Sequence, residues 1–206
     1  MSADLGVLYR NARMRVGAMV SDASGDTRVP ATPLWTVHDV VAHLGGVVDD
    51  VLAGNMEGVT TDPWTAAQVE RGRSKTVAQM LASWNEGAPV IEGFLSTPDG
   101  AAAYRAVLDV HTHEADLQNA LGHPLQLPAD FVEWMEPVML ANFEEAVAVA
   151  GLESIQVDIP AVELFRSRLG RRTVAEVMAY SWSADPTPYL DAWFLFGRAE
   201  QSLGEV

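Results

Sequence analysis

The chain has 206 residues and a formal net charge of −15 at pH 7, because 28 acidic residues outnumber 13 basic ones. This balance argues against nucleic acid or an anionic membrane surface as a partner, since both repel a negatively charged protein. The sequence contains no cysteine, which excludes disulfides, thiolate zinc sites and a cysteine nucleophile, so any metal must be held by His, Asp and Glu side chains.

The first residues carry neither a basic segment nor an apolar run, so no signal peptide is expected. No later stretch approaches the roughly 20 apolar residues that span a bilayer. We therefore expect a soluble, cytoplasmic protein.

Apolar residues at helical spacing predict three helices in the first half of the chain, over residues 3–20, 36–53 and 76–95. Thr36, followed three positions later by Asp39, resembles a capping box that begins the second helix. Pro89 predicts a kink or break in the third. Between these helices, 21–34 is predicted to be a loop and 58–74 to be irregular.

A fourth helix is predicted to follow the turn at Pro98 and to end at Gly122, a residue suited to the position after a helix. The later predicted elements are a fifth helix, a short half-buried strand and two short helices, over residues 129–150, 154–159, 162–169 and 174–182. We therefore expect a mainly α protein. Its body is a four-helix bundle over residues 1–150, and a small α+β appendage over 151–206 packs on it.

The fourth predicted helix concentrates acids and imidazoles at its centre. Asp109, His113 and Asp116 fall on one stripe at the edge of the apolar face, whereas His111 points nearly the opposite way. His43 flanks the buried face of the second helix. Bundles build metal sites from facing helices, and two imidazoles with one carboxylate leave a fourth position open, as in catalytic zinc sites. The spacing thus suggests a metal site of His43, Asp109 and His113, although such residues also commonly form local structural hydrogen bonds.

A rival interpretation takes residues 111–113 as a strand. Both imidazoles would then share one face, as in the His-x-His-x-x-Asp motif of some metallohydrolases. The flanking segments 101–108 and 115–121 are rich in helix formers, and the chain offers about one strand. The helix is therefore favoured.

Two further acids lie near the candidate ligands. Asp50 shares a face with His43, and Asp116 lies one turn from His113, so each could support a ligating imidazole. For Asp50 a solvated charge is the favoured alternative, and for Asp116 solvent exposure is an equal one. Neither of the two remaining histidines has a compelling partner in the sequence: His38 and His123.

Arginines form the only basic cluster of this acidic chain, at Arg166, Arg168, Arg171 and Arg172. They could bind an anionic substrate, because arginine holds carboxylates through two parallel hydrogen bonds. They could equally neutralise nearby Asp and Glu side chains.

Two segments resemble signature motifs of a known family. The run PLWTVHDVVAHLGG, residues 33–46, resembles the P-x-W-(T/S)-V-x-D-(V/L)-x-x-H-L segment of the mycothiol-dependent maleylpyruvate isomerase family. That family belongs to the wider DinB/YfiT-like group of helical-bundle metalloenzymes. Residues 110–124 are similar to its second signature, a helix ending H-x-x-D-(L/I)-x-x-A-L-G-x-P. Segments 163–173 and 182–190 also look like tail motifs of actinobacterial members.

The resemblance implies a DinB-like bundle in which zinc, or alternatively Ni²⁺ or Fe²⁺, is held by His43, Asp109 and His113. Asp109 stands where the better-known isomerases have Glu, whereas His111 and Glu114 do not correspond to ligands. The family's tail arginine, implicated in substrate handling, corresponds to one of two candidates, Arg171 or Arg172.

The activity implied by the resemblance is that of a metal- and mycothiol-dependent transferase or isomerase. Its partners would be a small-molecule thiol and an electrophilic small molecule of unknown identity. The alternative is a non-catalytic bundle that binds a metal or small molecule as a sensor or structural protein. We expect a monomer or homodimer.

Overall fold

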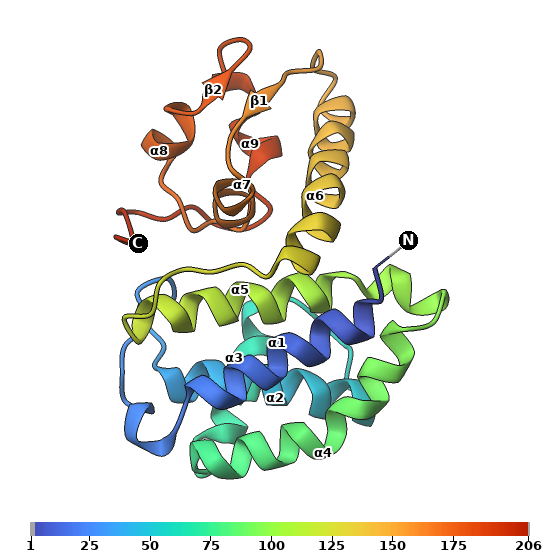
Figure 1. The fold of residues 1–206 in the computed structure, drawn as a ribbon, viewed down its shortest axis with the longest axis vertical. Helices are drawn as coiled ribbons and strands as arrows, with labels where there is room; N and C mark the ends of the chain where they lie inside the picture. Colours follow the sequence, from blue (N-terminus) through green and yellow to red (C-terminus); the bar gives the residue numbers. More distant parts are fainter. Residues whose placement is uncertain (1–2, 206) are drawn as a thin grey trace. The chain divides into compact units, whose positions relative to one another are not determined.

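The computed structural model describes residues 3–205, so Met1, Ser2 and Val206, which the predicted domains included, lie outside the described residues. The fold is mainly helical, and its internal contacts divide it into two compact units, residues 3–125 and 126–205 (Figure 1). Among these described residues, no helix combines the length and the apolar character needed to cross a membrane.

The N-terminal unit is a bundle of four long helices, α1 (Leu5–Met19), α2 (Val37–Ala53), α4 (Val77–Leu95) and α5 (Arg105–Ala120). Helices α1 and α2 each pack against both α4 and α5. Side chains from all four helices are buried in the core, including Ala12, Val16, Val40, Leu44, Trp84, Val107 and Leu117. The predicted mainly α fold with a bundle core is confirmed.

The ends of the bundle helices follow local sequence signals. At the start of α2 the Thr36 hydroxyl accepts a hydrogen bond from the backbone N–H of Asp39, and the Asp39 carboxylate accepts one from the backbone N–H of Thr36. This pair of hydrogen bonds is the predicted capping box. Pro89 lies inside α4, which continues past it to Leu95, so the predicted break does not occur and the predicted kink stays a prediction. A 3-10 turn (Asp99–Ala103) precedes α5. Gly122 follows α5 with φ 71°, a left-handed conformation that glycine adopts without strain.

Helix α3 (Asp62–Gly72) packs on α2. The prediction that residues 58–74 are irregular was therefore wrong for residues 62–72. Pro63 lies in the first turn of α3, where a missing N–H breaks no helical hydrogen bond. The buried residues of this helix are Trp64, Gln68 and Gly72.

Two glycines allow α2 and α3 to approach closely. A Cβ atom added at Gly46 of α2 would lie 2.7 Å from Cβ of Gln68, and one added at Gly72 of α3 would lie 2.4 Å from Cβ of Ala42. Both distances are far shorter than a carbon–carbon contact allows. The absence of side chains at Gly46 and Gly72 thus sets the spacing that brings Gln68 against α2.

The C-terminal unit contains α6 (Ala129–Val149), α7 (Ala161–Arg168), α8 (Val174–Met178) and α9 (Leu190–Trp193), with 3-10 turn Thr187–Tyr189 before α9. Strands β1 (Val157–Asp158) and β2 (Ser181–Trp182) pair antiparallel, with Val157 opposite Trp182. The predicted strand over 154–159 is thus present in shortened form. The predicted helix over 174–182 ends earlier, at Met178, and its last residues form β2 instead.

Helix α6 belongs to the C-terminal unit, whereas the sequence boundary at 150/151 grouped it with the bundle. The contacts of α6 explain why it belongs to the C-terminal unit. The ring centroid of Phe131 on α6 lies 5.1 Å from that of Phe165 on α7, and the ring centroid of Phe143 on α6 lies 4.9 Å from that of Trp193 on α9. The predicted packing of residues 151–206 on the bundle stays a prediction.

Candidate metal centre

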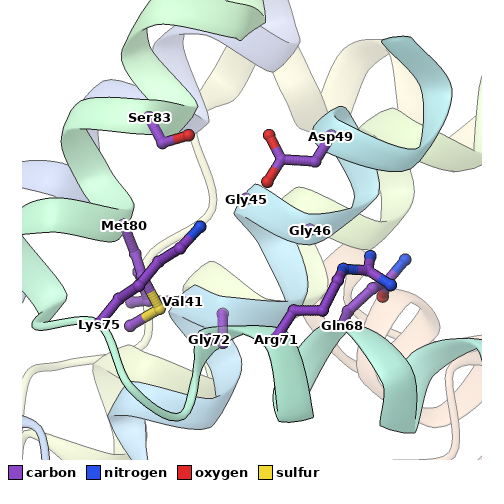
Figure 2. A pocket seen from close by; sticks show the side chains of 11 residues that line it. Val41, Gly45, Gly46, Asp49, Gln68, Arg71, Gly72, Lys75, Met80 and Ser83 are labelled. Carbon is purple, nitrogen blue, oxygen red and sulfur yellow. The ribbon is translucent and has the colours of Figure 1, made fainter. Parts of the chain in front are cut away.

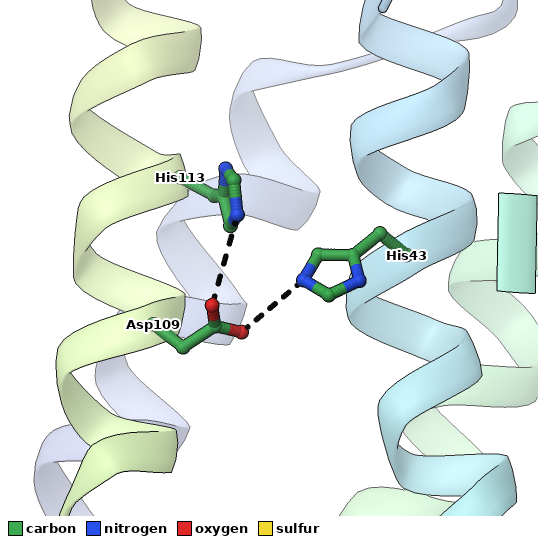
Figure 3. A group of neighbouring side chains, drawn as sticks. All are labelled: His43, Asp109 and His113. Carbon is green, nitrogen blue, oxygen red and sulfur yellow. Dashed lines mark ion pairs between the residues drawn. The ribbon is translucent and has the colours of Figure 1, made fainter. Parts of the chain in front are cut away.

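The three side chains singled out as ligands converge between α2 and α5 (Figure 3). The Nε2 atom of His43 lies 3.5 Å from Oδ2 of Asp109, and Nε2 of His113 lies 3.7 Å from Oδ1 of the same carboxylate. One donor atom from each residue lies within 4.8 Å of the other two. Two ligands that are each about 2.0–2.1 Å from a tetrahedral zinc ion are about 3.3–3.5 Å apart. Each imidazole nitrogen is thus at nearly this distance from one Asp109 oxygen, a different oxygen in each case, and the set of three donors, one from each residue, lies within 4.8 Å.

Helix geometry accounts for this convergence. Asp109 and His113 are four residues apart on α5, so they lie on one face, one turn apart. His43 faces them from α2. The rival interpretation of residues 111–113 as a strand was wrong, because the segment lies inside α5.

The site is enclosed around its nitrogens and open at its carboxylate. The side chains of His43 and His113 are 7% and 8% exposed, whereas that of Asp109 is 39% exposed. Water or a small ligand can therefore reach the cluster from the Asp109 side, while the imidazoles are held in packed surroundings.

Trp35, just before α2, forms an aromatic wall beside both imidazoles. Its ring centroid lies 5.4 Å from that of His43 and 5.9 Å from that of His113, with the second pair inclined by 30°. Trp35 is the tryptophan of the first signature motif, but the sequence did not predict a role for it. Its ring restricts the rotation of the two imidazoles and covers them on one side.

Behind His43 lies a buried polar network. Nδ1 of His43 is 2.7 Å from Oε1 of Gln68, whose Nε2 donates to Oδ2 of Asp50 at 2.8 Å. Asp50 also accepts hydrogen bonds from Arg71 at 2.7 Å and from Asn55 at 2.9 Å. Burial raises the pKa of Asp50, but the hydrogen bonds from Asn55, Gln68 and Arg71 outweigh it and hold the pKa below its ordinary value. Asp50 thus supports His43 through Gln68, and the plain alternative of a solvated charge was wrong.

A second carboxylate lies directly behind His113. Oδ2 of Asp116 is 3.2 Å from Nδ1 of His113, and the Asp116 side chain is fully buried. The contact does not have the geometry of a hydrogen bond, and Nδ1 of His113 has no hydrogen-bond partner among the described residues. Burial lowers the pKa of His43, but the charge of Asp109, its hydrogen bond and that of Gln68 together raise the pKa above the ordinary value.

The other polar residues of α5 and α2 have separate partners. Nδ1 of His111 donates to the backbone carbonyl one turn earlier at 2.8 Å, and Glu114 accepts two hydrogen bonds from Arg15, at 2.5 and 2.9 Å. Both lie outside the three-residue cluster. His38, for which the sequence suggested no partner, donates from Nε2 to the carbonyl of Lys75 at 2.8 Å.

The arginine cluster lies in the C-terminal unit and is engaged with acids and carbonyls. Arg172 donates to Glu163 at 2.7 and 2.9 Å and to Glu205 at 2.5 Å, and Arg166 pairs with the same Glu205. Arg171 donates to a backbone carbonyl at 2.6 Å. Arg166 and Arg172 thus neutralise carboxylates, one of the two predicted alternatives. A role for Arg171 or Arg172 in substrate handling stays a prediction.

A family model described as the mycothiol maleylpyruvate isomerase N-terminal domain matches residues 10–118, just over half of the chain. The matched region contains His43, Asp109 and His113 together with Gln68 and Asp50. No curated protein and no solved structure matches the chain.

Proposed function

The chain belongs to the mycothiol maleylpyruvate isomerase N-terminal domain family, and from this membership we propose that it is a metal-dependent enzyme that uses a low-molecular-weight thiol, mycothiol. The reaction is a thiol transfer to, or an isomerisation of, an electrophilic small molecule. The observation that carries the proposal is the convergence of His43, Asp109 and His113 within the family-matched residues.

The donor set fits a divalent metal ion. Two imidazole nitrogens and one carboxylate with an open fourth position suit catalytic zinc, and the same donors accept Ni²⁺ or Fe²⁺. His43 and His113 would hold the ion through Nε2, and Asp109 would neutralise one of its charges. A divalent ion held there supplies Lewis acidity that lowers the pKa of a bound thiol, so that thiolate is available near neutral pH.

The residues of the chain determine how the thiol reaches this site. The chain has no cysteine, so the nucleophilic sulfur comes from the cosubstrate. The exposed side of Asp109 leaves room for its approach, and Trp35 covers the imidazoles on another side. In an isomerase reaction the sulfur adds to one carbon of an activated cis double bond, the resulting single bond rotates, and the sulfur leaves with its electron pair. In a transferase reaction the new carbon–sulfur bond remains: either the sulfur displaces a leaving group, which departs with its electron pair, or it adds to a double bond whose other carbon takes up a proton.

Metal content and thiol-dependent turnover together test the proposal. Dialysed protein is assayed for zinc, nickel and iron by elemental analysis, then offered mycothiol with monobromobimane or maleylpyruvate; reactions without mycothiol are the control. One equivalent of metal with mycothiol-dependent turnover supports the enzyme. Metal without turnover favours the non-catalytic binding protein, and protein that retains no added metal contradicts the proposed site.

A further inference from the structure

A chain of polar side chains leads from the surface of α3 to the back of His43. The exposed end is Arg71, whose side chain is 44% exposed. Next come Asp50 and Gln68, which are 4% and 1% exposed, and the chain ends at Nδ1 of His43. Polar groups buried this deeply are costly unless their hydrogen bonds are satisfied, so the arrangement of donors and acceptors along this chain is constrained.

The chemistry of Arg71 and Asp50 sets the direction of every hydrogen bond. A guanidinium can only donate, and Nη2 of Arg71 lies 2.7 Å from Oδ1 of Asp50, so the carboxylate accepts. Oδ2 of Asp50 accepts as well, and the NH₂ group of Gln68 therefore faces it at 2.8 Å. The amide oxygen of Gln68 is then left facing Nδ1 of His43 at 2.7 Å. An oxygen acceptor at this distance requires a hydrogen atom on Nδ1.

A neutral imidazole carries one N–H group, so a hydrogen on Nδ1 leaves Nε2 with a free lone pair. Nε2 of His43 also faces an acceptor, Oδ2 of Asp109, but at 3.5 Å this contact is much longer than the 2.7 Å contact between Nδ1 and Gln68, so Nδ1 is the better position for the single hydrogen of the neutral ring. The chain from Arg71 thus selects the tautomer in which the lone pair of His43 points into the candidate metal centre.

Packing between α2 and α3 holds Gln68 in this orientation. Gln68 and Arg71 extend side by side from α3, next to Gly46 of α2 (Figure 2). A Cβ at Gly46 would lie only 2.7 and 2.8 Å from Cβ and Cγ of Gln68, so the stem of the glutamine is pressed against the backbone of α2. The cavity that the three residues help to line measures about 20 Å³, which is room for about one water molecule.

We infer that Gln68 is a positioning residue that, with Asp50 and Arg71, holds His43 in its Nδ1–H tautomer before any ion binds. The two imidazoles of the cluster then differ. Nδ1 of His113 lies 3.2 Å from the Asp116 carboxylate without a hydrogen bond, whereas Nδ1 of His43 is hydrogen-bonded to the Gln68 amide, which is itself bonded to the Asp50 carboxylate. The purpose of this arrangement rests on the proposed metal-dependent function. The tautomer itself is a property of the metal-free protein.

The first measurement reads that tautomer directly. Long-range ¹H–¹⁵N correlation spectra of metal-free protein with ¹⁵N-labelled histidine, recorded at a pH where the imidazoles are neutral, distinguish Nδ1–H from Nε2–H. The imidazole signal that disappears in the His43→Gln variant is assigned to His43. We expect Nδ1–H for His43 in the wild type, and Nε2–H in the wild type would overturn the inference.

Two variants test whether Gln68 and Asp50 cause the preference. Gln68→Met keeps the unbranched stem and removes the amide, and we expect His43 to become a mixture of tautomers. In Asp50→Asn the new side-chain amide can either donate or accept a hydrogen bond. The Gln68 amide can then rotate by 180°, and we again expect a mixture of the two His43 tautomers. Gln156→Met makes the same change at an exposed glutamine and should leave the spectrum of His43 unchanged. A pure Nδ1–H tautomer in both Gln68→Met and Asp50→Asn would also overturn the inference.

The second measurement is zinc affinity by competition with a chelator. Replacing an outer partner of a ligating histidine typically weakens metal binding about 10- to 100-fold, and we expect a loss of that size for Gln68→Met and none for Gln156→Met. Wild-type protein that binds no zinc would contradict the proposed function, while the tautomer of His43 would still decide the positioning role. If Gln68→Met does not fold, the spectra of the wild type and of Asp50→Asn decide whether the hydrogen-bonded chain sets the tautomer of His43.

Discussion

Nε2 of His43 on α2 lies 3.5 Å from Oδ2 of Asp109 on α5. The other oxygen of the same carboxylate lies 3.7 Å from Nε2 of His113. Asp109 is therefore shared between two buried imidazoles that come from different helices. Because it is the only acid of the cluster, the affinity of the site for a dication depends on its charge.

The first prediction concerns that charge. Asp109→Asn keeps the shape of the side chain but removes its negative charge and one ligating oxygen. We expect zinc affinity to fall by more than the about 10- to 100-fold that accompanies loss of an outer partner. Chelator competition measures the affinity, and circular dichroism checks that the helices remain. Asp49→Asn, at an exposed position of α2, is the matched control and should bind zinc as the wild type does. Equal affinities for the two variants would remove Asp109 from the ligand set.

The second prediction concerns His113. Its imidazole is one of only two nitrogen donors in the cluster, so His113→Ala should abolish metal retention after dialysis. Elemental analysis measures the retained metal. His123→Ala removes an exposed histidine from the turn after α5 and should retain metal fully. Full occupancy in a folded His113→Ala variant would refute the assignment.

Helical periodicity was sufficient to place the three cluster residues. Asp109 and His113 are separated by four residues on a segment rich in helix formers, so their shared face follows from helix geometry alone. The position of His43 beside the buried face of the second predicted helix added the third residue, and the family resemblance then pointed to the same three residues. Both signals are local patterns of residue type, and α2 and α5 form where those patterns lie.

The support behind His43 was not predictable in the same way. Helix α3 buries Trp64, Gln68 and Gly72, which follow the i, i+4, i+8 spacing of one narrow stripe. One of these residues is polar and another has no side chain, so the segment shows no apolar period. Helix detection by hydrophobic spacing fails for such a stripe, and Gln68 was therefore assigned to an irregular segment.

The assignment of α6 to a unit shows a related limit of prediction from the sequence. The helix buries Phe131 and Phe143 in the core of its unit. Periodicity identifies the buried face of a helix but not the element that covers it. The contacts with Phe165 and Trp193 depend on residues far along the chain.

The third prediction concerns the close approach of α2 and α3. Alanine favours a helix over glycine by up to about 1 kcal/mol, and Gly93→Ala, on α4 with nothing within 4 Å of the added Cβ, should be stabilised by up to that amount. Gly46→Ala places its Cβ 2.7 Å from Cβ of Gln68, and overpacking of this kind costs about 1–3 kcal/mol. We expect a net loss of unfolding free energy, measured by urea denaturation.

The displacement of Gln68 gives this variant a second readout. Gly46→Ala should also bind zinc more weakly than Gly93→Ala, because the amide that supports His43 is pushed away. The idea of a glycine-dependent contact is contradicted if the two variants are equally stable.

The fourth prediction is a pH dependence in the C-terminal unit. Glu163 accepts hydrogen bonds from Arg172 and, at 2.8 Å, from the hydroxyl of Tyr180. Burial raises the pKa of Glu163, but the hydrogen bonds of Arg172 and Tyr180 and the charge of Arg172 hold the pKa below its ordinary value of 4.5. In the unfolded chain these partners are lost and the pKa returns to that value.

A carboxyl group whose pKa is lower in the folded state stabilises the protein above the pKa of the unfolded chain. That contribution is present above pH 4.5 and is lost as the pH falls below 4.5 through the lowered pKa of the folded state. Glu163→Gln cannot titrate, so it should be less stable than the wild type at neutral pH, and the difference should shrink over that window. Urea denaturation from neutral pH to about pH 3 measures both curves. Glu153→Gln, at an exposed position, should follow the wild type throughout, and a constant difference between Glu163→Gln and the wild type would show that the ionised Glu163 does not supply this stability.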